Sequence, residues 1–318
     1  MNNPLRGRIL VTGHRGMVGS ALCRRLRRET EATVVTVDRD ALDLTDEAEV
    51  DAYFASADIE TVIFAAAKVG GIWANQSYPL EFLSDNVRMA MATIHAARRH
   101  GVRRFLYLGS TCIYPRDCPQ PIREDFLLTS SLESTNEAYA LAKIVGLKLC
   151  QYVRRQFGLL YHSAMPTNLY GPGDNYHPEH SHVLPALLRR FHEAKSAGAE
   201  VVSIWGTGSP RREFLHVDDL ADAIVFLLTL DNPPDWVNIG TGEEMTILEL
   251  ARKVSDVVGF TGRIETDPSR PDGTPRKRTD VSLLHGLGWS HRIDFTEGLR
   301  ATYEDFQQAL AKDLLRAL

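Results

Sequence analysis

The feature that most constrains the fold of this chain is a glycine-rich turn within "RILVTGHRGMVGS", residues 8–20, between an apolar run and a helical pattern. Gly13, Gly16 and Gly19 recur at every third position, and Met17 begins the helical pattern. Glycine permits a tight turn and a close approach of the backbone to a pyrophosphate, whose charge is favoured at a helix N-terminus. The turn therefore predicts a dinucleotide-binding strand–helix unit in which these four residues contact the cofactor.

Short β-type runs alternate with helical patterns through the first half of the chain. The runs "ATVVTVD", "TVIFAAA" and "RFLYLGS" are separated by the helical patterns "EAEVDAYFAS" and "LEFLSDNVRMAMATIHAARRHG". Such alternation is typical of parallel strands joined by right-handed helical crossovers. We expect an α/β fold with a Rossmann-type doubly wound parallel sheet, whose second strand ends at Asp38.

The pattern changes near residue 170, where Gly, Pro, His and Arg become frequent around a single helical run, "HVLPALLRRFHEAKSAG". Two later apolar segments, "DDLADAIVFLLTL" and "DWVNIGTG", can return to the first sheet, and the tail from Glu243 is expected to mix short helices and loops. We therefore expect a dinucleotide-binding domain and a smaller, discontinuous second domain. Their predicted boundaries are 1–167 with 217–241, and 168–216 with 242–318.

Composition excludes several classes of partner. The net charge of −5 gives no overall attraction for nucleic acid or for an anionic membrane. No apolar stretch approaches the roughly 20 residues needed to span a bilayer, and the N-terminus runs directly into a strand-like segment without a secretory signal. The four cysteines lack C-x-x-C spacing, which favours reduced thiols in a cytoplasm.

The choice between the two nicotinamide cofactors depends on three charged residues. Asp38 lies at the distance from the glycine turn where an acid binds the adenosine ribose, which favours NAD. Arg39 beside it and Arg15 inside the turn can instead bind the 2′-phosphate of NADP as bidentate donors. Both possibilities remain open at this point.

A hydride-transfer centre is indicated by "YALAK", in which Tyr139 and Lys143 are four residues apart and share one helix face. A tyrosine hydroxyl has a pKa of about 10, and a nearby ammonium favours its ionised form. Such a pair can exchange a proton with the oxygen of a carbon that gains or loses hydride. Ser110 follows the apolar run "RFLYLG" and is the candidate hydroxyl donor.

These residues resemble those of the extended short-chain dehydrogenase/reductase family. Within it, long segments are similar to the GDP-L-fucose synthases, from about residue 8 to residue 305: "GHRGMVG", "AAAKVGGIWANQSYP", "GSTCIYP", "PTNLYGPGDNYHPEHSHVLPALLRRFHEA", "WGTGSPRREFLHVDDLA" and "PDGTPRK". The resemblance implies that Tyr139 is the acid–base, that Lys143 supports it, and that both also contact the cofactor, NADP(H).

The resemblance implies a bifunctional reaction on GDP-4-keto-6-deoxy-D-mannose. Epimerisation at C3 and C5 is followed by reduction at C4 with NADPH, which yields GDP-L-fucose. The C4 ketone acidifies the hydrogens at C3 and C5, so epimerisation needs a base and an acid on opposite faces. By resemblance Cys112 is the base and His182 the acid; ordinary pKa values of about 8.5 and 6.5 suit this exchange.

The resemblance also assigns the second domain to the GDP-sugar. The residues that match nucleotide-sugar contacts are Asn168, Val183, Arg190, Trp205, Arg212 and Lys277. Guanidinium groups suit diphosphate oxygens, and an indole suits flat packing against a base. The same resemblance implies a homodimer through the helices near residues 80–100 and 138–157.

Alternative functions share most of these motifs. A GDP-colitose synthase or a related GDP-4-keto heptose epimerase/reductase differs only in pocket residues, whereas a non-catalytic dinucleotide-sensing protein would not need Ser110, Tyr139 and Lys143. A dehydratase is disfavoured because no Asp-Glu pair lies beside Thr111. We predict no metal site at His177, His180 and His182, since they occupy a Pro-interrupted loop without a further ligand cluster.

Overall fold

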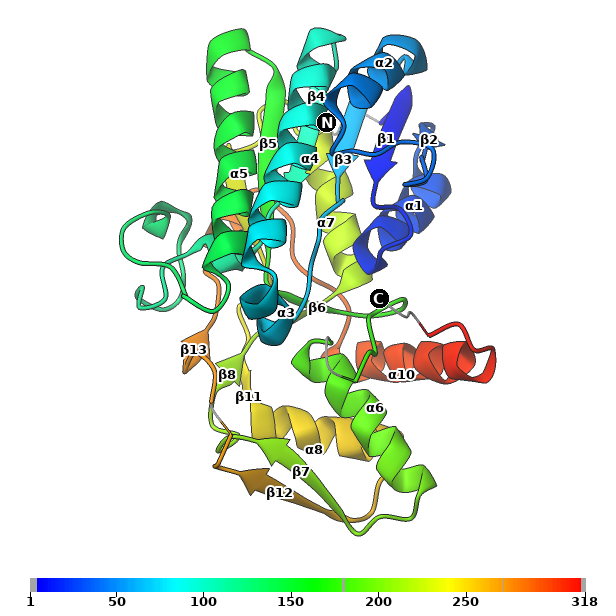
Figure 1. The fold of residues 1–318 in the computed structure, drawn as a ribbon, viewed down its shortest axis with the longest axis vertical. Coiled ribbons are helices and arrows are strands. Elements are labelled where there is room, and N and C mark those ends of the chain that lie inside the picture. The colour runs from blue at the N-terminus through cyan, green and yellow to red at the C-terminus, as the bar shows by residue number, and fades with distance from the viewer. Residues whose placement is uncertain (1–4, 179–180, 271, 316–318) are drawn as a thin grey trace.

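A parallel sheet of six strands forms the upper part of the molecule (Figure 1). The computed structural model describes residues 5–178, 181–270 and 272–315. The strand order is β10-β5-β4-β3-β1-β2, and every neighbouring pair is parallel. The strands are β1 (Arg8–Thr12), β2 (Thr33–Val35), β3 (Thr61–Phe64), β4 (Arg104–Leu108), β5 (Leu160–Pro166) and β10 (Trp236–Ile239). The predicted doubly wound α/β fold is confirmed.

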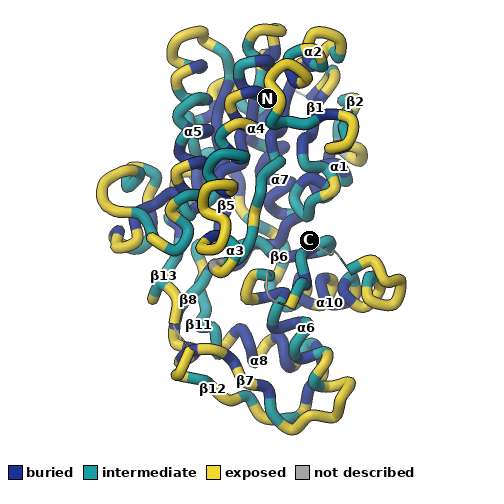
Figure 2. The backbone as a smooth tube through the Cα atoms, in the orientation of Figure 1, coloured by how far each residue is buried: buried dark blue, intermediate teal, exposed yellow. Residues whose placement is uncertain are grey.

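Helices cover both faces of this sheet. They are α1 (Met17–Glu29), α2 (Glu47–Ala57), α4 (Pro79–Arg99), α5 (Glu137–Phe157) and α7 (Val217–Thr229). Alternate strand residues enter different cores, as the two-residue period of a strand requires. Ile9 and Val11 pack with α1 and α7, whereas Leu10 between them packs with α2 and α4. Figure 2 shows the resulting buried sheet between half-exposed helices.

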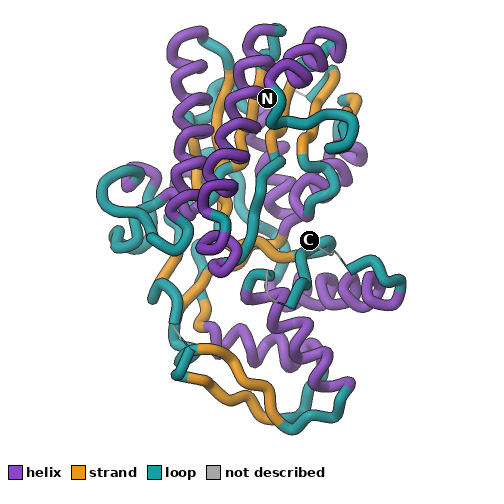
Figure 3. The backbone as a smooth tube through the Cα atoms, in the orientation of Figure 1, coloured by secondary structure: helices purple, strands orange, loops and turns teal. Residues whose placement is uncertain are grey.

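A second lobe lies below the sheet (Figure 3). It has its own hydrophobic core. Its helices are α6 (Val183–Ser196), α8 (Ile247–Val258) and α10 (Phe295–Ala311). Its strands form small sheets: β6 (Asn168–Tyr170) with β9 (Phe214–His216), β7 (Val201–Trp205) with β12 (Arg263–Asp267), and β8 (Arg211–Arg212) between β11 (Met245–Thr246) and β13 (Arg276–Lys277). Four short helices complete the fold: α3 (Ile72–Ser77), α9 (Ser282–Gly286), η1 (Thr111–Ile113) and η2 (Glu124–Phe126).

The chain passes between the two lobes more than once. It enters the lower lobe after β5 and returns as α7 and β10 to the sheet. It leaves again at β11, and then α9 brings Leu284 back into the core beneath α7 before α10 ends the fold in the lower lobe. The two lobes are therefore interleaved along the sequence.

Local signals explain where several helices begin. The Asp46 carboxylate accepts hydrogen bonds from the first amides of α2. Thr246 and Glu249 form a capping box at the start of α8. Asp294 accepts from two amides of α10, which spans 17 residues, so the expectation of only short helices in the tail was wrong. Its buried residues recur every three to four positions and fill the lower core.

The second strand is shorter than expected. β2 ends at Val35 rather than at Asp38, because it is an edge strand that pairs with β1 over three residues only. Asp38 therefore lies in a loop, where its carboxylate faces the glycine turn. Among the described helices, none has the length and apolar character required to cross a bilayer.

Candidate active site

The glycine turn has the backbone geometry that a bound dinucleotide requires. Gly13 has a positive φ of 68°, and a Cβ there would lie 2.9 Å from backbone atoms of Ala66. A Cβ on Gly19 would lie only 2.1 Å from the carbonyl oxygen of Gly13. Gly16 donates its amide to that same carbonyl at 2.9 Å and precedes the first residue of α1. The turn thus packs closely and leaves the N-terminus of α1 free to face an anion.

A cleft of about 410 Å³ opens beside this turn, at the carboxyl ends of β1, β2 and β3. We call it the cofactor cleft; its lining comes from three loops and α4, namely residues 12–16, 37–40, 42–45, 66–68, 85 and 89. Its volume suits a small-molecule ligand. The structure brings Gly13, Arg15, Gly16, Asp38 and Arg39 together around this cleft, as the sequence predicted.

Met17 and Gly19 do not line the cofactor cleft itself. Met17 packs partly buried against the core beneath α1, and Gly19 lies against the turn. The side chain of Met17 therefore faces the core while its backbone begins α1, and Gly19 lies behind the turn.

An ion-pair cluster occupies one end of the cofactor cleft. Arg15 Nη2 lies 2.6 Å from one carboxylate oxygen of Asp38, and His14 Nε2 lies 3.1 Å from the other. The Arg15 side chain is 74% exposed, so it can turn toward a ligand without leaving a buried position. Sequence reasoning missed His14, whose signal was only its place inside the turn.

Tyr139 and Lys143 share one face of α5, as their spacing predicted. Lys143 is buried, and its Nζ donates a hydrogen bond to the Leu108 carbonyl oxygen at 2.8 Å. The same Nζ lies 5.6 Å from the centre of the Tyr139 ring. Burial lowers the pKa of Lys143 to about 7, although the negative charge of Cys112 opposes that change.

Tyr139 is held in its protonated form. Burial raises the pKa of its phenol well above the ordinary value, and the charge of Cys112 raises it further. The ring also packs edge-on against Phe82 of α4, which fixes its orientation. A protonated phenol in this position can donate to an oxygen that becomes negative.

Ser110 and Cys112 lie on the turn that follows β4. The Ser110 hydroxyl accepts a hydrogen bond from the Cys112 amide at 3.2 Å and thereby begins η1. Cys112 is half-buried, whereas Cys23, Cys118 and Cys150 are buried. Of these four thiols, the turn therefore presents the least buried one, beside a small cavity.

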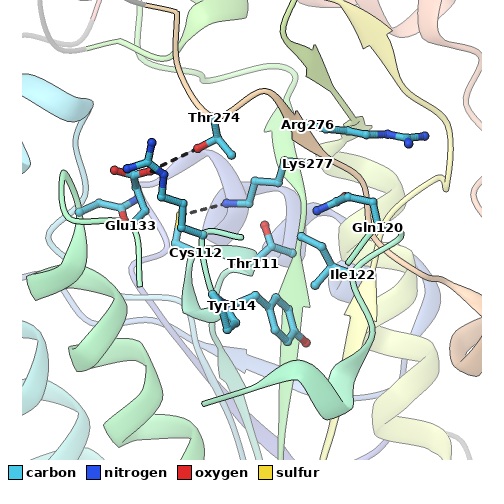
Figure 4. A pocket seen from close by; sticks show the side chains of 12 residues that line it. Thr111, Cys112, Tyr114, Gln120, Ile122, Glu133, Thr274, Arg276 and Lys277 are labelled. Carbon is cyan, nitrogen blue, oxygen red and sulfur yellow. Dashed lines mark hydrogen bonds and ion pairs between the residues drawn. The ribbon is translucent and has the colours of Figure 1, made fainter. Parts of the chain in front are cut away.

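Lys277 of β13 points its ammonium at this thiol (Figure 4). Its Nζ lies 3.5 Å from the Cys112 sulfur, across 165 residues of sequence. Burial by itself raises the pKa of Cys112, but the Lys277 charge and hydrogen bonds from Ser110, Lys277 and Asn136 together bring it below the ordinary value. Sequence reasoning placed Lys277 at the nucleotide and missed both this contact and Asn136.

A small cavity of about 50 Å³ adjoins the thiol. We call it the thiol pocket, and its lining residues are Thr111, Cys112, Tyr114, Pro115, Arg116, Gln120, Ile122, Glu133, Asn136, Thr274, Arg276 and Lys277. Asn136 immediately precedes α5, and its buried side-chain oxygen Oδ1 has no hydrogen-bond partner. That orphaned acceptor is available to a ligand hydroxyl.

His182 immediately precedes α6 and belongs to the same electrostatic group. Burial lowers the pKa of its imidazole, and the positive charge of Lys277 lowers it further. Because Lys277 acts on both His182 and Cys112, the three side chains surround one region of the site. The Lys277 charge therefore favours the neutral form of the imidazole and the ionised form of the thiol.

The remaining predicted substrate residues lie in the lower lobe. Trp205 ends β7 and is 59% exposed, with the Arg270 guanidinium 5.2 Å from its ring centre. Arg190 donates to the Ser203 carbonyl at 2.8 Å, and Arg212 donates to the Thr274 carbonyl at 2.6 Å. An exposed indole beside partly buried guanidinium groups can receive a base and its phosphates.

Two further predicted contacts lie nearer the sheet. Asn168 in β6 donates its side-chain amide to the Glu213 carbonyl at 2.8 Å. Val183 is the first residue of α6 and is 36% exposed. The roles of these residues in binding remain predictions.

The histidine loop lies between β6 and α6. His177 donates its amide to the Asn175 side chain at 2.9 Å, and His180 lies outside the described residues. Within residues 5–178, 181–270 and 272–315, no three His, Cys, Asp or Glu side chains form a group able to hold a metal ion.

Comparison with known proteins gives a consistent set of relatives. Residues 9–240 match the model of the NAD dependent epimerase/dehydratase family. The chain is 56% identical to GDP-L-fucose synthase 1 of Arabidopsis thaliana, over 93% of this chain and 92% of that protein. It is 50% identical to GDP-L-fucose synthase of Escherichia coli, over 94% and 96%. GDP-L-colitose synthase of Yersinia pseudotuberculosis is more distant, at 38% identity over 94% and 97%.

Solved structures have the same fold. A GDP-L-fucose synthetase from Naegleria fowleri bound to NADP superposes with a TM-score of 0.90 at 27% identity, covering 98% of this chain and 97% of that one.

Proposed function

This chain belongs to the NAD dependent epimerase/dehydratase family, and from that premise we propose that it converts GDP-4-keto-6-deoxy-D-mannose into GDP-L-fucose. It is an NADP-dependent epimerase/reductase, as its synthase relatives and the NADP-bound neighbour support. The observation that carries the specific proposal is the pairing of two chemistries in one site. Cys112 and Lys277 form a thiolate centre, and its charge acts on the Tyr139 and Lys143 pair on α5.

The cofactor cleft fits NADP(H), because its volume of about 410 Å³ suits a small-molecule ligand and its lining combines Gly13 and Gly16 of the turn with Arg15 and Arg39. Gly13, Gly16 and the start of α1 would hold the pyrophosphate, and Arg15 with Arg39 would hold the 2′-phosphate. NADPH supplies the hydride for C4 when bound. Tyr139 donates its proton to the C4 oxygen, and Ser110 positions that oxygen by a hydrogen bond.

Epimerisation uses the thiol and the histidine. The Cys112 thiolate removes a proton from C3 or C5, and the carbon's electron pair moves into the C4 carbonyl to form an enolate. His182 takes a proton from solvent and donates it to the opposite face of that carbon, which leaves the imidazole neutral again. The Cys112 thiol releases its proton to solvent and returns to the thiolate, so atoms and charge balance over each inversion.

We place the GDP portion in the lower lobe. The proposed division is residues 1–167 with 217–241 for the cofactor and 168–216 with 242–318 for the GDP-sugar. The exposed Trp205 supports a base-stacking position, and Arg190 and Arg212 support one for the diphosphate. The higher identity to the fucose synthases favours that product over the colitose alternative.

We further propose that the enzyme acts as a homodimer in the cytoplasm. Met91 of α4 and Tyr152 of α5 are large apolar side chains that are 42% and 49% exposed on adjacent helices (Figure 1). Helices α4 and α5 of a second copy of this chain would cover these two side chains. Four free cysteines suit a reducing compartment. Sedimentation at micromolar concentration tests the dimer, and fractionation of the source cells tests the compartment.

The decisive experiment incubates the enzyme with GDP-4-keto-6-deoxy-D-mannose and NADPH and identifies the sugar by NMR. We expect GDP-L-fucose in proportion to the NADPH consumed. Parallel incubation with GDP-4-keto colitose and heptose precursors provides the comparison. Preferential turnover of one of those substrates, or a product that keeps the D configuration, would contradict the proposal.

A further inference from the structure

Lys277 lines the thiol pocket beside Cys112. Lys277 was expected to contact the GDP by resemblance, yet its Nζ lies 3.5 Å from the Cys112 sulfur. Figure 4 shows the side chain extending from β13 across the pocket toward Cys112. We propose that Lys277 is a positioning residue that holds Cys112 as a thiolate, ready to remove the protons at C3 and C5.

The contact is built into the fold rather than left to a mobile chain end. The strand β13 pairs with β8, and Arg276 forms an ion pair with Glu244 at 2.7 Å. On the other side of Lys277, the Arg278 amide donates to the Gln120 side chain at 2.9 Å, and the Arg278 carbonyl accepts from the Ile122 amide at 2.7 Å. Lys277 is thus fixed at both flanks: Arg276 is tied to Glu244 just before β11, and Arg278 is tied to the segment that follows Cys112.

A buried carboxylate secures the segment two residues further on. Glu213 is fully buried and accepts from the Thr279 amide at 2.8 Å and from its hydroxyl at 2.7 Å. It also accepts from the amides of Thr241 and Gly242. These bonds join β13 to the end of β10, so the sheet and the lower lobe together determine where the ammonium lies.

The other charged groups around Cys112 do not replace Lys277. The titratable and charged side chains that surround the thiol are Arg116, Tyr114, Glu133, Tyr139, Lys143, His182, Arg276 and Lys277. Arg116 lies 3.5 Å from Glu133, and Arg276 is paired with Glu244. Lys143 donates to the Leu108 carbonyl. Lys277 is the cation that contacts the sulfur, and an opposite charge at that distance favours the thiolate.

This inference rests on the proposed function for its substrate, but its test begins without substrate. Iodoacetamide alkylates thiolates, and mass spectrometry of the Cys112 peptide gives the rate at that residue across pH. At pH 7 we expect Lys277→Met to slow alkylation of Cys112 about tenfold, the equivalent of a rise of about one pKa unit. Lys277→Arg keeps the charge and should remain within about threefold of wild type. Lys253→Met removes an exposed lysine of α8 outside the thiol pocket; it is the matched control and should leave the rate unchanged.

A kinetic measurement separates this role from nucleotide binding. With GDP-4-keto-6-deoxy-D-mannose in D₂O, Lys277→Met should lower kcat for exchange at C3 and C5 about tenfold or more, with KM changed less than threefold. A raised KM with unchanged alkylation would make Lys277 a nucleotide ligand and overturn the inference. Lys277→Gln repeats the test should Lys277→Met not fold. If wild type leaves this substrate unchanged, the proposed function fails, while the alkylation result stands alone.

Discussion

The cofactor cleft and the thiol pocket are assembled in opposite ways. The cofactor cleft is large and draws its lining mainly from loops that follow the first three strands, all within residues 12–89. The thiol pocket is small and joins the turn after β4 to β13, across 165 residues between Cys112 and Lys277. The cofactor cleft results from the local order of strands and helices. The thiol pocket forms only when both lobes are folded together. The comparison teaches that the reductive and epimerising parts of the site can be damaged separately.

The largest effect is expected from a substitution that inactivates the thiol pocket and leaves the cofactor cleft intact. Cys112→Ser nearly conserves volume, but a hydroxyl is too weak an acid to rest as an anion, so exchange at C3 and C5 should fall about 10³-fold. Deuterium incorporation from D₂O into GDP-4-keto-6-deoxy-D-mannose, followed by NMR, measures the loss. NADPH binding should be unchanged, and slow reduction of the unepimerised ketone to a D-series sugar is expected.

Two variants accompany that measurement. His182→Gln should also impair epimerisation while keeping partial exchange at the proton that the cysteine removes first. Cys118→Ser controls for the loss of a thiol elsewhere. Wild-type exchange of both hydrogens in Cys112→Ser would show that the cysteine only fills space.

The second largest effect is expected from a substitution in the reductive part of the site. Tyr139→Phe removes the phenol that donates to the C4 oxygen, so kcat for NADPH oxidation should fall on the order of 10². Binding of the GDP-sugar should persist, and deuterium exchange at C3 and C5 should continue, because the thiol contact with Lys277 is independent of the phenol. Stopped-flow absorbance of NADPH measures the reduction. Turnover near the wild-type value would remove Tyr139 from the mechanism.

A smaller effect sharpens the description of the cofactor cleft. Wild type should prefer NADPH through Arg15 and Arg39, but weakly, because Asp38 repels the 2′-phosphate and is itself paired with Arg15 at 2.6 Å. Asp38→Asn should raise the ratio of kcat/KM for NADPH over NADH on the order of tenfold. Asp40→Asn, another charge loss in the same loop, is the control. A wild-type preference for NADH would mean that Asp38 decides and that the arginines do not bind phosphate.

The smallest effect concerns the sheet that supports both regions. His162 in β5 is buried, and neither ring nitrogen has a hydrogen-bond partner. Burial lowers its pKa to about 3, with further lowering by the charges of Arg154 and Arg104. In the unfolded chain the pKa of His162 is near 6.5, so the unfolded state binds this proton more readily than the folded state. His162 therefore does not lower the free energy of unfolding above about pH 6.5, but lowers it progressively as the pH falls from 6.5 toward 3.

Urea unfolding at pH 7 and pH 5 measures this contribution. Wild type should lose about 2 kcal/mol of unfolding free energy through this residue between the two pH values. His162→Leu should remove that part of the loss, whereas His285→Gln at an exposed position should keep it. If His162→Leu loses as much unfolding free energy between pH 7 and pH 5 as wild type does, another group causes the acid sensitivity. The result also separates unfolding at low pH from protonation of Cys112.

Prediction from sequence succeeded where a signal is local. The glycine turn, the strand–helix alternation and the i, i+4 spacing of Tyr139 and Lys143 each specify geometry within a few residues, and the sheet and the cofactor cleft follow from them. The end of β2 was misplaced because pairing at a sheet edge depends on the neighbouring strand. The Lys277 contact was missed because no pattern in the sequence relates β13 to the turn after β4.

Asn136 is a second residue whose role could not be predicted from the sequence. An asparagine just ahead of a helix is usually interpreted as a cap, yet its side chain makes no capping hydrogen bond here. Only the fold shows its free oxygen buried beside the thiol.

The interleaving of the two lobes has a consequence for how such a chain can diverge. No single crossover point exchanges the lower lobe for that of a relative, because removing everything after β10 also takes Leu284 and Trp289 out of the sheet's core. A chimaera that carries a new sugar pocket must replace several separate segments at once and keep α7, β10 and α9 matched to their sheet. New substrates are therefore reached more readily by point changes within the site than by shuffling of modules.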